Sequence, residues 1–153
     1  MMVTMGLITR LQTCGLAVSL LASALLAMGG CHREPPSERG AVTLPVYHTE
    51  WAEQGRAAYQ NDCEQCHTLR PGSNHKAPQL MRVYGAPAAA LKDYQYTDAM
   101  QTKAQQGWHW TAENLDRYIA DPHAAIPGTR MESDKITDPA ERQAIVAYLS
   151  TLR

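Results

Sequence analysis

The 153 residues are enough for one modest domain and an export segment, and no internal repeat is visible. Lysine and arginine total 14 against 15 aspartate and glutamate residues, so the chain carries no strong field of either sign. This balance argues against a nucleic-acid partner and against binding to an acidic membrane surface by charge alone.

Residues 1–30 have the layout of a secretory signal. One positive charge, at Arg10, precedes an uncharged stretch rich in Leu and Ala, residues 11–28, and two glycines follow it. Cys31 comes directly after these small residues, as in a bacterial lipobox, where the cysteine is lipid-modified and becomes the mature N-terminus. Met28 stands where a lipobox usually has Leu, and the apolar stretch is about the minimum length for a membrane span. An uncleaved N-terminal anchor and ordinary cleavage are therefore the alternatives, and in each case we expect the domain on the periplasmic side.

A flexible tether is predicted for residues 31–48. The segment combines charged residues and three prolines and shows no helical period. We expect it to give reach to a globular domain, residues 49–153, so that the domain can move between partners near a membrane.

The globular domain is predicted to begin with a helix over about Thr49–Asp62, with Thr49 as the N-cap. Gly55 lies on the apolar face of this helix and lowers its stability, so we expect another element to approach closely there. The last helix is the candidate, because Asp138-Pro139-Ala140-Glu141 is typical of a helix start. Its apolar stripe consists of Ile145, Tyr148, Leu149 and Leu152.

Two more helices are predicted between these ends. One begins after Thr111 and stops at Asp121-Pro122, because proline cannot continue it, and a short one covers about 98–106. The rest of 68–110 is rich in loops, and no stretch shows a convincing strand alternation. The fold class is therefore all-α, and the domain is too loose to fold well on its own apolar burial.

Cys63-Glu64-Gln65-Cys66-His67 is the motif that indicates a function. Two thiols at this spacing can add to the two vinyl groups of one haem, and the adjacent imidazole can then ligate the iron. The motif predicts one covalently bound haem c, which would also fill the core. A bare C-x-x-C also occurs in redox dithiols and as half of a zinc site. The missing strand pattern argues against a thioredoxin-like domain, and the missing second ligand pair argues against zinc.

With these residues the chain resembles class I cytochrome c, in the branch of mitochondrial cytochrome c and bacterial cytochrome c2. The resemblance implies a small class I fold, with three to five helices wrapped around one covalently bound haem. Ordered matches run from about residue 55 to residue 152. They are Gly55–Tyr59, the haem motif, Ala77–Leu80, Tyr94–Ala99, Trp110, Leu115–Pro122, Ile126–Met131 and Ile145–Leu149.

The resemblance also assigns a role to each further candidate residue. Met131 would be the sixth iron ligand, a soft thioether that favours ferrous iron and raises the reduction potential. Pro78 would accept the Nδ1–H of His67 through its carbonyl oxygen and so fix the imidazole tautomer. Two pairs would line the pocket: Tyr96 and Trp110 as donors to a buried haem propionate, and Tyr118 and Thr129 near the methionine sulfur.

The chain departs from the family pattern at several places. Ala86 stands where the family commonly has an arginine close to a propionate, and Met100 replaces a common polar residue near the haem. The ring of basic residues around the haem edge is thin, with Lys76, Lys92, Lys103, Arg130 and Lys135 as its candidates. Met81 and Met100 are the competing methionines. The competing histidines are His32, His48, His75, His109 and His123.

The leading hypothesis is an electron carrier and not an enzyme, because iron ligated by both His67 and Met131 has no open position for a substrate. The expected partners are membrane redox complexes, a bc1-type donor and a terminal oxidase or reductase acceptor. We expect a monomer tethered to the membrane through lipid on Cys31 or through an N-terminal anchor. The alternative is a haem-based gas sensor or weak peroxidase in which the bond to Met131 is labile.

Overall fold

Five α-helices and one short 3-10 helix make up the regular structure of residues 37–153, the part of the chain that the computed structural model describes. In chain order they are η1 (Thr49–Trp51), α1 (Ala52–Asp62), α2 (Asp98–Gln105), α3 (Ala112–Ala120), α4 (Pro122–Ala125) and α5 (Pro139–Thr151). Within these residues there is no strand, only an isolated antiparallel bridge between Pro87 and His109. The predicted all-α class is confirmed, whereas the predicted leader 1–30 lies outside the described residues.

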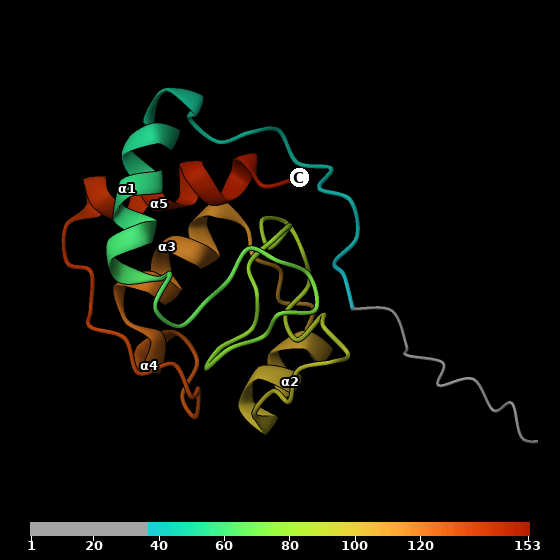
Figure 1. Cartoon of the computed structure of the whole chain (residues 1–153). Helices are drawn as coiled ribbons and strands as arrows, with labels where there is room; N and C mark the ends of the chain where they lie inside the picture. The colour runs from blue at the N-terminus through green and yellow to red at the C-terminus, as the bar shows by residue number, and fades with distance from the viewer. Residues whose placement is uncertain (1–36) are drawn as a thin grey trace, which may run out of the picture. The chain divides into compact units, whose positions relative to one another are not determined.

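Helices α1 and α5 cross and pack against each other, and α3 packs beside α5 (Figure 1). The apolar periodicity of each helix turns one face inward. Gly55, Ala58 and Tyr59 of α1 are buried, as are Ile145 and Leu149 of α5. Burying a side chain such as Ile145 fully stabilises the fold by about 1.5–3 kcal/mol. The three helices thus form one rigid wall, and loops complete the rest of the domain.

Side-chain caps set the starts of the helices that follow the haem motif. Thr97 accepts from Met100 N at the start of α2, and Thr111 accepts from Asn114 N at the start of α3. At the start of α5 the Asp138 carboxylate accepts from Ala140 N at 2.9 Å, with Pro139 as the first helical residue. These caps satisfy backbone N–H groups that have no partner inside the helix.

The prediction that Thr49 caps a continuous helix is wrong. Thr49 is already the first residue of η1, and His48 precedes it with a left-handed backbone, φ 42°. The N-cap of α1 is Trp51, which makes no side-chain capping hydrogen bond. A tight 3-10 turn, closed by the hydrogen bond from Trp51 N to His48 O, therefore replaces the first turn of the expected helix.

Helix α4 was not predicted, and Asp121 explains it. The residue ends α3 with an extended backbone, and its carboxylate then accepts from Ala124 N at 3.0 Å as the N-cap of α4. Pro122, which cannot continue α3, suits the first position of the next helix. The same two residues therefore end one helix and begin another.

Residues 37–48 run along the domain past its C-terminus (Figure 1). The Arg153 guanidinium donates to the carbonyl oxygens of Val42 and Leu44, at 3.0 and 2.9 Å. Tyr47 N donates to Ser150 Oγ at 2.9 Å. These residues, two thirds of the predicted tether 31–48, are thus attached to the domain through partners far away in the sequence. Within residues 37–153 no helix combines the length and apolar character needed to cross a bilayer.

Candidate functional site

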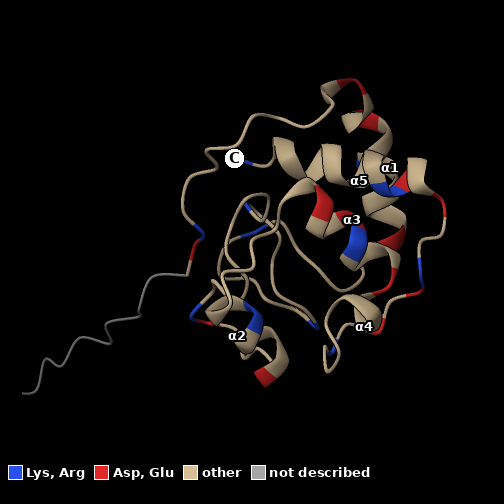
Figure 2. Ribbon diagram, turned by 180° about the vertical axis from the view of Figure 1, so that it is seen from behind, with Lys and Arg blue, Asp and Glu red and all other residues tan. Residues whose placement is uncertain are grey.

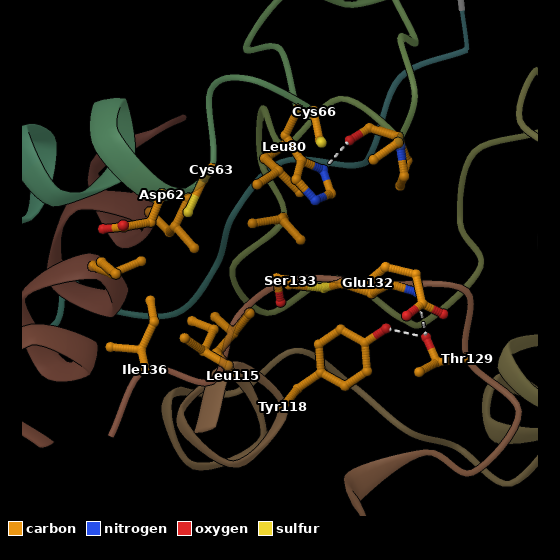
Figure 3. Close-up of a pocket in the computed structure, with 18 of the residues that line it drawn as sticks. Asp62, Cys63, Cys66, Leu80, Leu115, Tyr118, Thr129, Glu132, Ser133 and Ile136 are labelled. Carbon is orange, nitrogen blue, oxygen red and sulfur yellow. Dashed lines mark hydrogen bonds between the residues drawn. The ribbon is translucent and has the colours of Figure 1, made fainter. Parts of the chain in front are cut away.

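One cavity of about 720 Å³ brings all nine predicted site residues together. They are Cys63, Cys66, His67, Pro78, Tyr96, Trp110, Tyr118, Thr129 and Met131. Its walls are completed by apolar side chains, among them Leu80, Val83 and Leu115. Figure 3 shows Cys63, Cys66 and Leu80 on one side of the cavity and Leu115, Tyr118 and Thr129 on the opposite side. The volume falls within the range of about 300–1,000 Å³ that is usual for cofactor sites.

The cysteine motif forms a tight turn at the end of α1. Cys63 N donates to Tyr59 O at 2.9 Å, and His67 N donates to Cys63 O at 2.9 Å. This winding turns Cys63, Cys66 and His67 toward one cavity. The two sulfurs form no disulfide, and burial raises the pKa of the Cys63 thiol to about 12. Reactive thiols of oxidoreductases have a lowered pKa, so the site does not suit a redox dithiol.

His67 is held in one orientation. Its Nδ1 lies 2.7 Å from the carbonyl oxygen of Pro78, within hydrogen-bond distance. The Tyr59 hydroxyl donates to the backbone carbonyl of His67 at 2.9 Å. Burial lowers the pKa of His67, which favours the neutral ring. A neutral imidazole that donates from Nδ1 keeps the lone pair of Nε2 for a metal ion.

The opposite wall contains the Tyr118–Thr129 pair. The two hydroxyl groups are hydrogen-bonded to each other, and both residues are 8% exposed (Figure 3). Burial raises the pKa of Tyr118, so its hydroxyl stays protonated near neutral pH. Thr129 N donates to Ile126 O at 3.0 Å, and Thr129 Oγ1 accepts from Met131 N at 3.4 Å. The turn before Met131 is thus attached to α3 through Thr129.

Tyr96, Trp110 and Arg39 provide polar side chains in the wall of the cavity. Tyr96 and Trp110 were predicted from the sequence, whereas Arg39 was not. Trp110 is 8% exposed, and its backbone N–H donates to Ala86 O at 2.9 Å. Burial raises the pKa of Tyr96. No local pattern marks Arg39, because its contacts are with residues about 40 positions away.

The competing ligands are placed less favourably. Among the histidines that the structure describes, His67 alone lines the cavity, while His48, His75, His109 and His123 are exposed. His32 lies outside the described residues. Of the methionines, Met81 does not line the cavity, whereas Met100 does so from α2.

The chemistry of the wall fits a haem c. Two thiols, a fixed imidazole, a thioether and apolar surfaces are the groups that such a cofactor requires. Within residues 37–153, no group of three or more His, Cys, Asp or Glu side chains is arranged so that it could hold a metal ion. Basic residues are spread over several elements and mixed with acidic ones (Figure 2).

Comparisons with known proteins agree with this site. Residues 52–153 match the family model described as Cytochrome c. The cytochrome c-type cyt cy of Rhodobacter capsulatus is 33% identical over 108 residues, which are 71% of this chain but only 52% of that protein. Cytochrome c2 iso-2 of Magnetospirillum fulvum is 36% identical over 90 residues, 59% of this chain and 91% of that protein.

Among solved structures, cytochrome cH from Methylobacterium extorquens matches with a TM-score of 0.59 at 34% identity, over 65% of this chain and 97% of that one. The family match covers two thirds of the chain and includes the C-x-x-C-H motif, every lining residue of the cavity except Arg39, and all five α-helices of the described residues. The chain therefore belongs to the cytochrome c family, as a class I member that binds one covalently attached haem c and acts as a haem-based electron carrier.

Proposed function

We propose that this cytochrome carries single electrons through an iron ligated by His67 and Met131. One observation carries the proposal: His67 and Met131 line the same cavity as the two cysteines of the haem motif. His67 and Met131 would hold the iron as its two protein ligands and would leave no position free for a substrate. The protein then exchanges electrons with partner proteins and does not act as an enzyme.

Each of the other candidate residues has a task in this proposal. Cys63 and Cys66 form the two thioethers, and Pro78 holds the tautomer of His67 through the 2.7 Å contact. Thr129 joins the loop of Met131 to Tyr118, which limits the movement of the thioether. When bound, the haem supplies a one-electron Fe(III)/Fe(II) couple. The apolar wall excludes water, so little rearrangement accompanies the change of charge.

We also propose a location and partners. The signal-like residues 1–30 support export to the periplasmic side, and Cys31 supports attachment to a membrane by lipid, with an N-terminal anchor as the alternative. The partners would be a bc1-type donor and a terminal oxidase or reductase acceptor. A tethered monomer has a high effective concentration near such complexes, which compensates for weak docking.

Intact mass of the mature protein, combined with a redox titration, tests the proposal. We expect the mass of one haem, a chain that begins at Cys31, added acyl chains and a reversible one-electron transition. A mass that includes residue 1 would replace the lipid with an uncleaved anchor. A mass that begins elsewhere without acyl chains would contradict both forms of attachment.

Binding of carbon monoxide distinguishes an electron carrier from the alternative function, a haem-based gas sensor or weak peroxidase. A ferrous iron closed by Met131 should show little spectral change when carbon monoxide is added, and the ferric protein should keep its thioether-to-iron charge-transfer band. A large change of the ferrous spectrum at neutral pH would favour the sensor or peroxidase.

A further inference from the structure

Arg39 is a buried positive charge in the wall of the haem cavity. Four basic side chains line this cavity: Arg39, Lys76, Arg130 and Lys135. The other three are exposed, whereas Arg39 is 6% exposed. A guanidinium group is almost never buried without a partner, because removing its charge from water is costly.

The contacts of Arg39 within the protein leave its charge uncompensated. Its Nη1 donates to the carbonyl oxygens of Gln79, at 2.6 Å, and of Met81, at 3.0 Å. Its Nε is buried and has no hydrogen-bond partner in the part of the chain that the structure describes. No carboxylate among the same residues lies within 4 Å of the guanidinium. Burial lowers the pKa of Arg39, and the Tyr96 hydroxyl and the more distant Asp93 carboxylate offset this effect only in part.

The cofactor of this cavity supplies the missing anion, because a haem carries two propionate carboxylates. We propose that Arg39 forms an ion pair with a haem propionate and that the segment 37–48 contributes to the haem site through this one lining residue. The proposal rests on the haem of the preceding sections and goes beyond it, since the family match begins only at residue 52. A charged, hydrogen-bonded pair satisfies both groups where neutral donors alone would leave the carboxylate charge unpaired.

The place of Ala86 agrees with this assignment. Ala86 stands where the resemblance to class I cytochrome c implies an arginine near a propionate. In the structure Ala86 is buried, and its carbonyl accepts from Trp110 N, whose side chain lines the cavity. Ala86 itself does not line the cavity, whereas Arg39 of the N-terminal segment does and brings a positive charge to it. Ser37 and Glu38 fix this segment nearby, through Lys92 N at 2.9 Å and Arg82 at 3.5 Å.

A simpler role for Arg39 is that of a latch. Its two hydrogen bonds to carbonyl oxygens hold residues 37–48 on the domain whether or not a propionate is present. A latch affects how firmly the segment is attached. It does not affect the proton affinity of a haem carboxylate, so the pH dependence of the reduction potential separates the two roles.

The experiment compares R39Q, R39K and R82Q with the unaltered protein in redox titrations between about pH 5 and 9. R82Q is the matched control, since Arg82 also holds the segment, through Glu38, but does not line the cavity. The other titratable groups that face Arg39 are Tyr96, Asp93 and His67. All three are kept in every variant.

We expect the unaltered protein and R82Q to show a potential that is nearly independent of pH over this range. In R39Q the buried propionate loses its cation, so its pKa rises into the range. Ferric iron has the larger positive charge and favours the ionised propionate more than ferrous iron does. The potential of R39Q should therefore fall as pH rises and lie below that of the unaltered protein at alkaline pH. R39K should keep the flat profile.

Each outcome decides between the roles. If R39Q has the same flat profile as the unaltered protein, Arg39 is a latch and the proposal fails. If R39K shows the pH-dependent profile of R39Q, a positive charge at position 39 does not keep the propionate ionised, and the ion pair is refuted. Thioether attachment keeps the pigment in every variant, so a loosened segment does not prevent the titration. An unaltered protein without a Soret band would instead refute the haem assignment itself, which separates that failure from this one.

Discussion

Gly55 of α1 lies against the backbone of Ala144 in α5. A Cβ atom at position 55 would be 1.8 Å from the Ala144 carbonyl oxygen and 2.4 Å from its carbonyl carbon. No real Cβ approaches so closely, so the crossing of the two helices depends on glycine at this position. The close approach expected from a glycine on an apolar helix face is confirmed, and α5 is the neighbour.

Gly55→Ala should therefore destabilise the domain. The better helix propensity of alanine gains about 1 kcal/mol, but the added methyl group must push apart two helix backbones, which costs about 3 kcal/mol or more. We expect a net loss of at least about 2 kcal/mol in the free energy of unfolding, measured in guanidinium. Gly40→Ala is the control, because nothing lies within 4 Å of a Cβ there. Equal stability of the two variants would contradict the contact.

Replacing the motif cysteines should release the haem. In the double variant Cys63→Ser, Cys66→Ser no thioether can form, so acid-acetone extraction should remove all pigment and the protein mass should fall by one haem. Each single variant should keep one thioether and hold its pigment less well. Pigment that resists extraction from the double variant would mean that the motif has been misinterpreted.

Met131→Ala should lower the reduction potential and open the iron to carbon monoxide. Loss of the thioether removes the ligand that favours ferrous iron, and we expect a fall of roughly a few tenths of a volt, within the ~0.8 V that axial ligands span. Met81→Ala is the control, since Met81 does not line the cavity. If the spectrum and potential of Met131→Ala are unchanged, another residue is the ligand, and Met100 is the next candidate.

The Tyr118–Thr129 hydrogen bond should appear as a coupling energy. Both hydroxyl groups are buried, so Tyr118→Phe or Thr129→Val leaves the other without its partner, at a cost of about 1–3 kcal/mol. The double variant removes both groups and should cost less than the sum of the single changes. A double-mutant cycle from denaturant unfolding measures the difference. Strictly additive costs would show that the two side chains do not interact in solution.

Local patterns explain most of what could be predicted from sequence. The capping residues Thr111 and Asp138 act on backbone groups two or three positions away, so their effect does not depend on the rest of the fold. Helix α4 was missed because Pro122 was interpreted only as the end of α3. The prediction of Thr49 as an N-cap was wrong because the left-handed backbone of His48 leads into a 3-10 turn.

The helical class and the haem motif of Cys63, Cys66 and His67 were evident in the sequence, because a covalent attachment site and amphipathic helices depend on spacing along the chain. The other six candidate site residues came only from the resemblance to class I cytochrome c. Only the tertiary structure decided that residues 37–48 lie on the domain and that Arg39 enters the cavity. The partners of Arg39, the carbonyl oxygens of Gln79 and Met81, lie about 40 residues away. Backbone carbonyls are common to all residues and carry no sequence signal, so only packing could place the charge beside them.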